Sequence, residues 1–251
     1  MTKKRVWKFA LPGVIVIKLI VIIVLLNASF REPENVVYEK AKFNGMEIPD
    51  SLTFAGEPVH LSYFDVRENL ERELLINAYF HSQTIRFIKL APRYFSVIEP
   101  ILEEKEVPGD FKYLAVAESS LDPRAVSPAQ AVGLWQFLKT TAREYRLEVN
   151  NEVDERYHVE KSTYAACDYL KSAYEKFGSW ALVAAAYNAG RSFTVSQVER
   201  QKTNNYFDLL LGEETERYVF RILALKLVLE NPEKYGFEIP EEKKYPVIPT
   251  R

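Results

Sequence analysis

The stretch Leu114-Ala-Val-Ala-Glu118-Ser-Ser-Leu-Asp-Pro123 places one carboxylate at the end of a short, strongly apolar segment. Asp110 can cap a helix that enters this stretch, and Pro123 disfavours helix in the residue before it, so we expect the helix to end near Asp122. Ionising a carboxylate against apolar walls is unfavourable, and the carbonyl groups at a helix C-terminus add to that effect. The pattern therefore favours a raised pKa for Glu118, as a general acid needs near neutral pH. The alternative is a solvated glutamate at a helix end.

The surrounding sequence predicts a mainly α domain. Apolar residues with a period near 3.6 begin at Phe64 and reach Tyr79, with Asp65 as the candidate N-cap. A second helix is expected from Tyr94 to Lys105, interrupted by Pro100. Helix C-cap positions are expected at Gly178 and Gly190, and no pair of strands joined by a hairpin turn stands out. Further helices are predicted over residues 133–146, 159–177, 180–189 and 213–230.

Composition excludes several classes of function. The 251 residues are 47% hydrophobic and 27% charged, which suits one folded domain with additional segments. A net charge of -2 argues against a nucleic-acid-binding surface, so no nucleic acid is expected as a partner. Cys167 is the single cysteine, the three histidines are scattered, and the glycines are too far apart for a phosphate-binding loop. We therefore expect no disulfide, no metal and no organic cofactor.

The amino terminus has the pattern of a targeting segment. Lys3, Lys4 and Arg5 precede a mostly apolar run over residues 9–26, which is close to the ~20 residues that span a bilayer. Basic residues before the run favour a cytoplasmic amino end and an exported body. We expect a signal or membrane anchor over 1–30, a linker or lead-in over 31–63, the main domain over 64–236 and a tail over 237–251.

Three motifs follow one another along the chain, and a fourth segment lies near its end. In order they are Glu118-Ser-Ser-Leu-Asp-Pro-Arg-Ala-Val-Ser127, Ala131-Val-Gly-Leu-Trp-Gln-Phe137, Ala185-Ala-Tyr-Asn-Ala-Gly190 and Glu214-Thr-Glu-Arg-Tyr-Val219. This set resembles the lytic transglycosylases of the soluble, goose-lysozyme-like type, and within them the membrane-bound murein transglycosylase D group. The resemblance covers roughly residues 94–236 and implies a lysozyme-like α fold.

The resemblance implies a specific reaction. Enzymes of this family bind peptidoglycan strands and cut the β-1,4 bond between N-acetylmuramic acid and N-acetylglucosamine. One glutamate, matched by Glu118, protonates the leaving oxygen and then takes the proton of the C6 hydroxyl, which closes onto C1 as a 1,6-anhydro end. The implied protein is a monomer of the cell envelope, exported to the periplasm and held at the inner membrane if residues 9–26 are retained. Two alternatives stay open: a muramidase that uses water, and a non-catalytic peptidoglycan-binding protein.

The same resemblance assigns substrate contacts to polar residues, each of which has a structural alternative. Ser127 and Gln136 would contact the muramic sugar, or else form a Ser-Pro turn and a helix-surface amide. Tyr187 would hydrogen-bond near Glu118 and help to set its protonation, or else lie in the core. Tyr218 has a similar implied role but lies in an apolar helix stripe. Asn188 completes the implied set, and Trp135 is interpreted as part of the cleft wall.

A second catalytic carboxylate is not evident. Most glycosidases use two carboxylates, but Asp122 lies beside Pro123 and is better suited to capping the following loop. Asp154 and Glu155 lie in a polar stretch and are expected to be solvated. The sequence also departs from the family pattern, with Leu138-Lys-Thr-Thr141 in place of Met-Pro-x-Thr and Arg191-Ser192 in place of Pro-Gly. These departures put the shape of the cleft in doubt rather than the acid.

Overall fold

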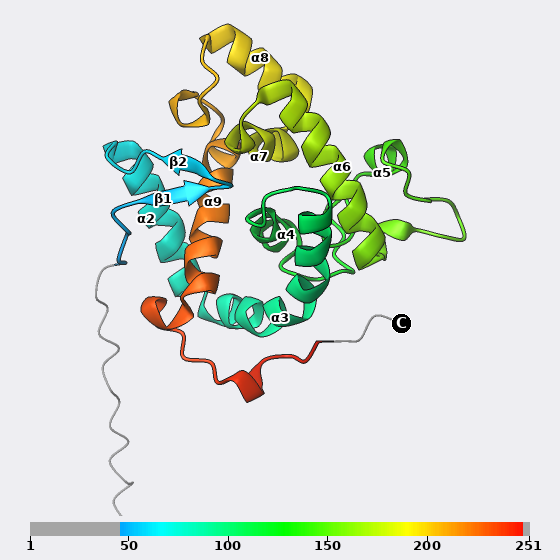
Figure 1. The fold of residues 1–251 in the computed structure, drawn as a ribbon, viewed down its shortest axis with the longest axis horizontal. Helices are drawn as coiled ribbons and strands as arrows, with labels where there is room; N and C mark the ends of the chain where they lie inside the picture. The colour runs from blue at the N-terminus through cyan, green and yellow to red at the C-terminus, as the bar shows by residue number, and fades with distance from the viewer. Residues whose placement is uncertain (1–45, 248–251) are drawn as a thin grey trace, which may run out of the picture. The chain divides into compact units, whose positions relative to one another are not determined.

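The computed structural model describes residues 46–247, and these residues are mainly helical (Figure 1). The prediction of a mainly α domain is confirmed. The predicted leader over residues 9–26 lies outside the described residues. Within 46–247, no helix is both long and apolar enough to cross a membrane.

Helix α9 (Glu213–Glu230) is the centre of the packing, beside α2 (Phe64–Tyr79), α4 (Phe111–Ser119) and α7 (Trp180–Ala189) (Figure 1). Ten of its residues are buried, because apolar side chains occur on most of its faces. Glu213, Glu214 and Glu216 lie in its first turn, where acidic side chains interact favourably with the helix dipole. Residues on α9 are thereby held against the end of α4.

Helix α7 is short and tightly packed. Its residues Ala181 to Ala186 are buried, and their small side chains let it pack against α6 (Val159–Phe177), α8 (Arg191–Gln201) and α9. Ser179 is its N-cap and accepts a hydrogen bond from the backbone N–H of Leu182. Gly178, at a φ of 63°, ends α6 in the left-handed conformation expected of a C-cap glycine.

A hairpin joins the helical body from within the predicted lead-in. Strands β1 (Leu52–Phe54) and β2 (Glu57–Val59) pair antiparallel across Ala55 and Gly56, which both have positive φ. Glu57 accepts hydrogen bonds from the backbone N–H groups of Trp180 and Ala181, at 2.6 and 3.3 Å, and so caps α7 from outside. The compact unit begins at Met46, and the segment predicted as a lead-in over 31–63 includes this hairpin.

The segment after residue 236 also contacts the body. Phe237 is buried beside His81, with the two ring centroids 4.7 Å apart. The backbone N–H of Tyr245 donates to the Lys89 carbonyl of α3 (His81–Glu104), and Lys89 lies over the Tyr245 ring. This part of the predicted tail therefore packs on α3.

Helix α3 is longer than expected. It begins at His81 rather than near residue 94 and contains both Pro92 and Pro100. Each proline removes one backbone donor, but burial of side chains such as Phe87 and Ile98 along the helix offsets that loss. The predicted N-cap of α2 is wrong, because Tyr63 occupies that position instead of Asp65. Asp110 is the N-cap residue of α4, as predicted, but its carboxylate accepts from the Ala55 N–H and from Lys226 rather than from the helix.

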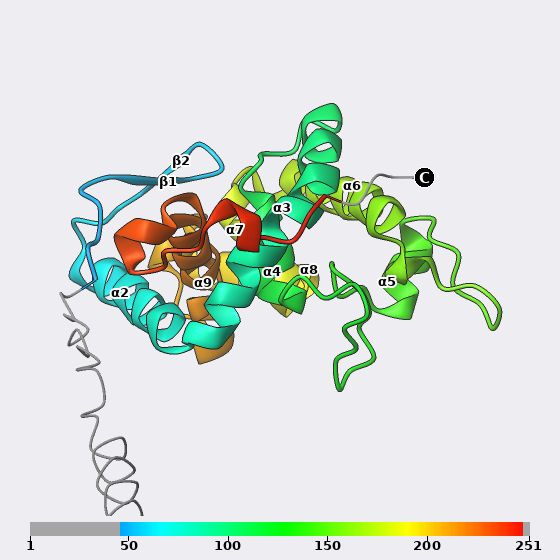
Figure 2. The same cartoon turned by 90° about the horizontal axis from the view of Figure 1, so that it is seen from below.

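The helix predicted over residues 133–146 is wrong. Only Lys139–Glu144 is helical (α5), and the residues before it form a looped segment in which Val132 pairs with both Val126 and Phe137. Gly133 has a φ of 84°, and a Cβ there would lie 2.0 Å from the Arg156 carbonyl oxygen. The connections on either side of α5 extend away from the helical body (Figure 2). The apolar residues of this segment are buried as part of a loop rather than on the face of a helix.

Candidate active site

Glu118 lies in the last turn of α4, which ends at Ser120 in the left-handed conformation. The preceding turns are apolar and almost wholly buried, with Leu114 and Ala115 at 0% exposure. Glu118 itself is partly exposed. The helix therefore delivers one carboxylate to the edge of the apolar core, as its sequence predicted.

Burial raises the pKa of Glu118 to about 7 from an ordinary value of 4.5. Three nearby groups modify this effect. A hydrogen bond from Tyr218 and the positive charge of Arg221 lower the pKa, whereas the negative charge of Glu214 raises it. Loss of hydration outweighs the stabilising groups, and Glu118 is held close to half-protonated at neutral pH.

Tyr218 is the residue that contacts Glu118 directly. It is 2% exposed on α9, and its hydroxyl donates a hydrogen bond to Oε1 of Glu118. Burial and the neighbouring carboxylate raise the pKa of Tyr218 well above its usual value, so the phenol keeps the proton that it donates. The implied position of Tyr218 beside the acid agrees with this geometry.

Tyr187 lies near Glu118 but bonds elsewhere. Its hydroxyl donates to the backbone carbonyl of Trp135 at 2.6 Å, and its ring meets Tyr169 edge-on with centroids 5.0 Å apart. Burial raises the pKa of Tyr187, and the charge of Glu118 adds to that rise. Tyr187 thus anchors the loop that precedes α5, while Tyr218 contacts the carboxylate.

Ser127 and Gln136 hold the two ends of that loop. The Ser127 hydroxyl accepts from the Ala131 backbone N–H at 3.0 Å, which is the turn expected as its structural alternative. Gln136 has a φ of 48°, and its side-chain amide donates to the carbonyls of Ala125 and Gly133 at 3.2 and 2.8 Å. The interpretation of Gln136 as a helix-surface amide is wrong, because no helix forms there.

A cavity of about 290 Å³ opens between the end of this loop and the end of α7. Asn188 lines it and accepts a hydrogen bond from the Thr215 hydroxyl at 3.1 Å. Amide, phenol and hydroxyl groups share the wall with apolar surface, a mixture suited to a polar ligand with apolar faces. The lining comprises Gln136, Phe137, Leu138, Thr141, Tyr169, Tyr187, Asn188, Ala189 and Gly190.

Arg156 stabilises the loop from outside the motifs, and the sequence analysis did not find it. Its guanidinium donates to the carbonyls of Gln130 and Phe137, each at 3.0 Å, and pairs with Asp154 at 2.6 Å. Asp154 is therefore not simply solvated, and the ion pair lowers its pKa. The sequence signal was an arginine near an aspartate, which does not reveal that loop carbonyls lie beside it.

Three further predicted residues, Trp135, Asp122 and Glu155, have partners within the fold. Trp135 is fully buried and donates from its indole N–H to the Thr163 hydroxyl at 2.9 Å, so its interpretation as cleft wall is wrong. Asp122 accepts from the Arg124 backbone N–H at 2.9 Å, in agreement with a loop-capping role. Glu155 is also held rather than free, since it accepts from the Glu148 N–H and pairs with Lys161.

Arg191, at the departure from the family pattern, supports the cavity wall. Its guanidinium lies 4.1 Å from the Tyr169 ring centroid and 5.6 Å from that of Tyr145. Cation–π contacts of this kind stabilise aromatic walls.

Among residues 46–247, no cluster of three or more histidine, cysteine, aspartate or glutamate side chains is placed to hold a metal ion.

Comparison with known proteins identifies the domain that carries this site. Residues 97–209 match the family described as Transglycosylase SLT domain. Glu118 and the cavity-lining Gln136, Tyr187 and Asn188 lie within the matched SLT residues. Tyr218 follows them on α9.

Curated relatives agree with this assignment. Over 199 residues the chain is 33% identical to "Membrane-bound lytic murein transglycosylase D" of Escherichia coli (strain K12). This alignment covers 76% of this chain and 43% of that protein. The chain thus spans less than half the length of that relative. It is also 27% identical over 161 residues to a protein of Alteromonas sp. (strain M-1) named for resistance to tributyltin chloride, covering 62% of this chain and 77% of that protein.

A solved structure of an inactive mutant of the lytic transglycosylase Slt from Pseudomonas aeruginosa aligns with a TM-score of 0.42 and 17% identity. The alignment covers 61% of this chain and 26% of that one.

Proposed function

We propose that this protein is a peptidoglycan lytic transglycosylase in which Glu118 is the single acid and base. The observation that carries the proposal is the Glu118 carboxyl, with its pKa raised by burial to about 7 and bound by Tyr218, inside an SLT domain. A pKa near the working pH lets one group both donate and accept a proton in the same cycle. The substrate is the glycan strand of peptidoglycan, by similarity to relatives named murein transglycosylases.

The reaction needs two proton transfers through one carboxyl group. Protonated Glu118 gives its proton to the glycosidic oxygen as the bond from that oxygen to C1 of the muramic sugar breaks. The resulting carboxylate takes the proton of the C6 hydroxyl of the same sugar as O6 bonds to C1. Glu118 returns to its protonated state, and the product has a 1,6-anhydro end. No water molecule is consumed.

The surroundings of Glu118 favour attack by the C6 hydroxyl of the same sugar rather than catalysis by a second carboxylate. Asp122 is held by the loop backbone, and Asp154 is paired with Arg156. Glu214 raises the pKa of Glu118 through its charge, but it lies exposed in the first turn of α9. A base that activated water would need to lie on the opposite face of the sugar.

Tyr218 and the cavity beside the loop have supporting roles. The Tyr218 hydroxyl stabilises the Glu118 carboxylate that forms after the first transfer. Gln136 and Asn188 line the cavity and offer amide groups to the acetamido and hydroxyl groups of the muramic sugar. Ser127 and Tyr187 hold the backbone of the loop that carries Gln136, so their contribution to binding is indirect.

We further propose that the protein works in the periplasm as a monomer, attached to the inner membrane when residues 9–26 are retained. One relative is named a membrane-bound enzyme, and the basic, apolar amino terminus has the pattern of an anchor. The domain would then reach glycan strands from the membrane surface.

Mass spectrometry of the products released from purified peptidoglycan tests the proposal. The full chain should release anhydro-muropeptides, and Glu118→Gln should reduce their formation by about 10²- to 10⁴-fold while the unfolding temperature does not fall. Products with reducing ends would support the water-using muramidase instead. Glycan that binds without release of any product would support the non-catalytic alternative.

A further inference from the structure

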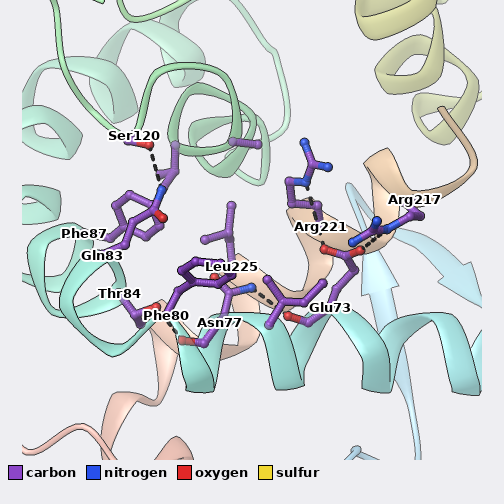
Figure 3. A pocket seen from close by; sticks show the side chains of 13 residues that line it. Glu73, Asn77, Phe80, Gln83, Thr84, Phe87, Ser120, Arg217, Arg221 and Leu225 are labelled. Atoms are coloured by element: carbon purple, nitrogen blue, oxygen red, sulfur yellow. Dashed lines mark hydrogen bonds and ion pairs between the residues drawn. The ribbon is translucent and has the colours of Figure 1, made fainter. Parts of the chain in front are cut away.

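A second cavity, of about 270 Å³, is lined by residues of α2, α3, α4 and α9 (Figure 3). Ala117 and Ser120 of α4 form part of its wall, so it opens within one helical turn of Glu118. Its size is just below the ~300 Å³ of the smallest typical ligand pockets, which suits one substituent of a larger ligand. Its lining is polar as well as apolar, with Glu73, Asn77, Gln83, Thr84, Arg217 and Arg221.

Two arginines and one buried carboxylate line this cavity. The Glu73 side chain is 2% exposed, and its Oε1 accepts from Arg217 Nε at 2.6 Å. Arg221 approaches the other carboxylate oxygen only at 3.9 Å. Arg217 also pairs with Glu213 at 3.4 Å, and the charge of Arg221 acts on Glu118, but among the described residues Arg221 makes no short ion pair of its own.

Arg221 has donors available to a ligand. Among the described residues its guanidinium makes the single 3.9 Å ion contact, and its side chain is 35% exposed. Figure 3 shows the guanidinium of Arg221 directed away from Glu73, whereas that of Arg217 points to it. The opposite wall is satisfied internally, because the Gln83 amide donates to the Ser120 hydroxyl and Asn77 to the Glu73 carbonyl.

We propose that this cavity is a carboxylate-binding subsite in which Arg221 binds an acidic group carried by the glycan. The inference rests on the proposed function, since peptidoglycan carries carboxylates on its stem peptides, and on the lactyl group of muramic residues from which the stem peptide has been removed. An arginine fork is suited to a carboxylate because it can donate two parallel hydrogen bonds. Such a contact next to Glu118 would select strands by the substituent that lies beside the bond to be cut.

Binding to the full chain in detergent, with Glu118→Gln in every protein, tests this subsite without turnover. That background also removes the interaction of Arg221 with the Glu118 carboxylate. The probes are a muropeptide tetrasaccharide with its stem peptides, the same glycan after removal of the peptides by an amidase, and chitotetraose, which has no carboxylate. Arg221→Gln should weaken binding of a carboxylate-bearing glycan about tenfold and leave chitotetraose within twofold.

Two variants serve as controls. Arg221→Lys keeps the charge and should restore part of the affinity, which would not happen if the loss came from misfolding. Arg200→Gln removes an exposed arginine of α8 and should change none of the three affinities.

The pattern across the probes identifies the carboxylate. Loss only with peptides attached assigns a peptide carboxylate, because the lactyl carboxyl is then an amide. Loss only on the amidase-treated glycan assigns the free lactyl carboxylate, and loss on both shows that the subsite accepts either. Equal weakening of all three probes, or no weakening of any, would overturn the subsite. In that case release of anhydro-muropeptides by the unmutated protein would still leave the proposed function standing.

Discussion

The two sides of Glu118 are built in different ways. On one side, α9 presents Tyr218 and Arg221 from a regular helix, ten of whose residues, Tyr218 among them, are buried. On the other side, residues 125–137 form a loop with positive φ at Gln130, Gly133 and Gln136. The helix side acts on the charge of the carboxylate, and the loop side shapes a cavity. The pKa of Glu118 therefore depends on how α9 packs in the core, whereas the shape of the cavity depends on a small number of hydrogen bonds from distant residues.

Replacement of Arg156, the main support of the loop, should have the largest effect on the stability of the protein. Arg156→Met leaves the carbonyls of Gln130 and Phe137 without their donor and Asp154 without its ion pair. We expect the free energy of unfolding to fall by about 3–5 kcal/mol, measured by urea denaturation. Arg200→Met, at an exposed site on α8, should change it by less than about 0.5 kcal/mol. Equal effects of the two substitutions would show that Arg156 does not support the loop.

The acid itself should destabilise the fold at high pH. Its pKa is about 7 in the folded state and 4.5 when unconstrained, so between these pH values the folded state holds more protons than the unfolded state. Stability contributed by protonated Glu118 is therefore lost as the pH rises from about 4.5 to 7. Glu118→Gln does not lose this stability, because glutamine does not ionise.

The variant should accordingly be more stable than the unmutated protein at pH 8, by up to about 3 kcal/mol at 1.36 kcal/mol per unit. Near pH 4 the two proteins should be alike. Denaturation curves at both pH values make the comparison, and a difference that is the same at pH 4 and pH 8 would contradict it.

The two tyrosines should differ in their effect on the pH dependence of activity. Tyr218→Phe removes the hydrogen bond that lowers the pKa of Glu118, so the alkaline limb of the pH–rate profile should move to higher pH. We expect the maximal rate to fall about tenfold, as for loss of one hydrogen bond to a charged group. Tyr187→Phe loses a bond to the Trp135 carbonyl and should leave the alkaline limb in place. An unmoved limb in Tyr218→Phe would contradict the contact.

Regular elements of this fold were largely predictable from the sequence. The helices at 159–177, 180–189 and 213–230 match the structure, because long apolar periods and end signals such as Gly178 agree with one another. The hairpin was missed because Ala55-Gly56 is not a typical hairpin turn, and the Asp110 carboxylate that binds the Ala55 N–H lies far away in the sequence.

The candidate site was predictable in its helix but not in its loop. Apolar residues before Glu118 indicated a desolvated acid, and the structure places the carboxyl at the edge of the core. The segment over 133–146 has apolar spacing compatible with a helix, yet Gly133 and the contacts of Arg156 impose another backbone. Local sequence could not show which tyrosine contacts the acid, since the distance depends on how α9 packs against α4.

Direct titration of Glu118 tests the central claim of a single acid with a raised pKa. Carbon-13 NMR of carboxyl-labelled glutamate in the full chain would follow each side chain from pH 3 to 9, and the resonance missing in Glu118→Gln identifies Glu118. The predicted midpoint is about 7. A midpoint near the ordinary value of 4.5 would contradict the account, because Glu118 would then be ionised at neutral pH and could not donate the first proton.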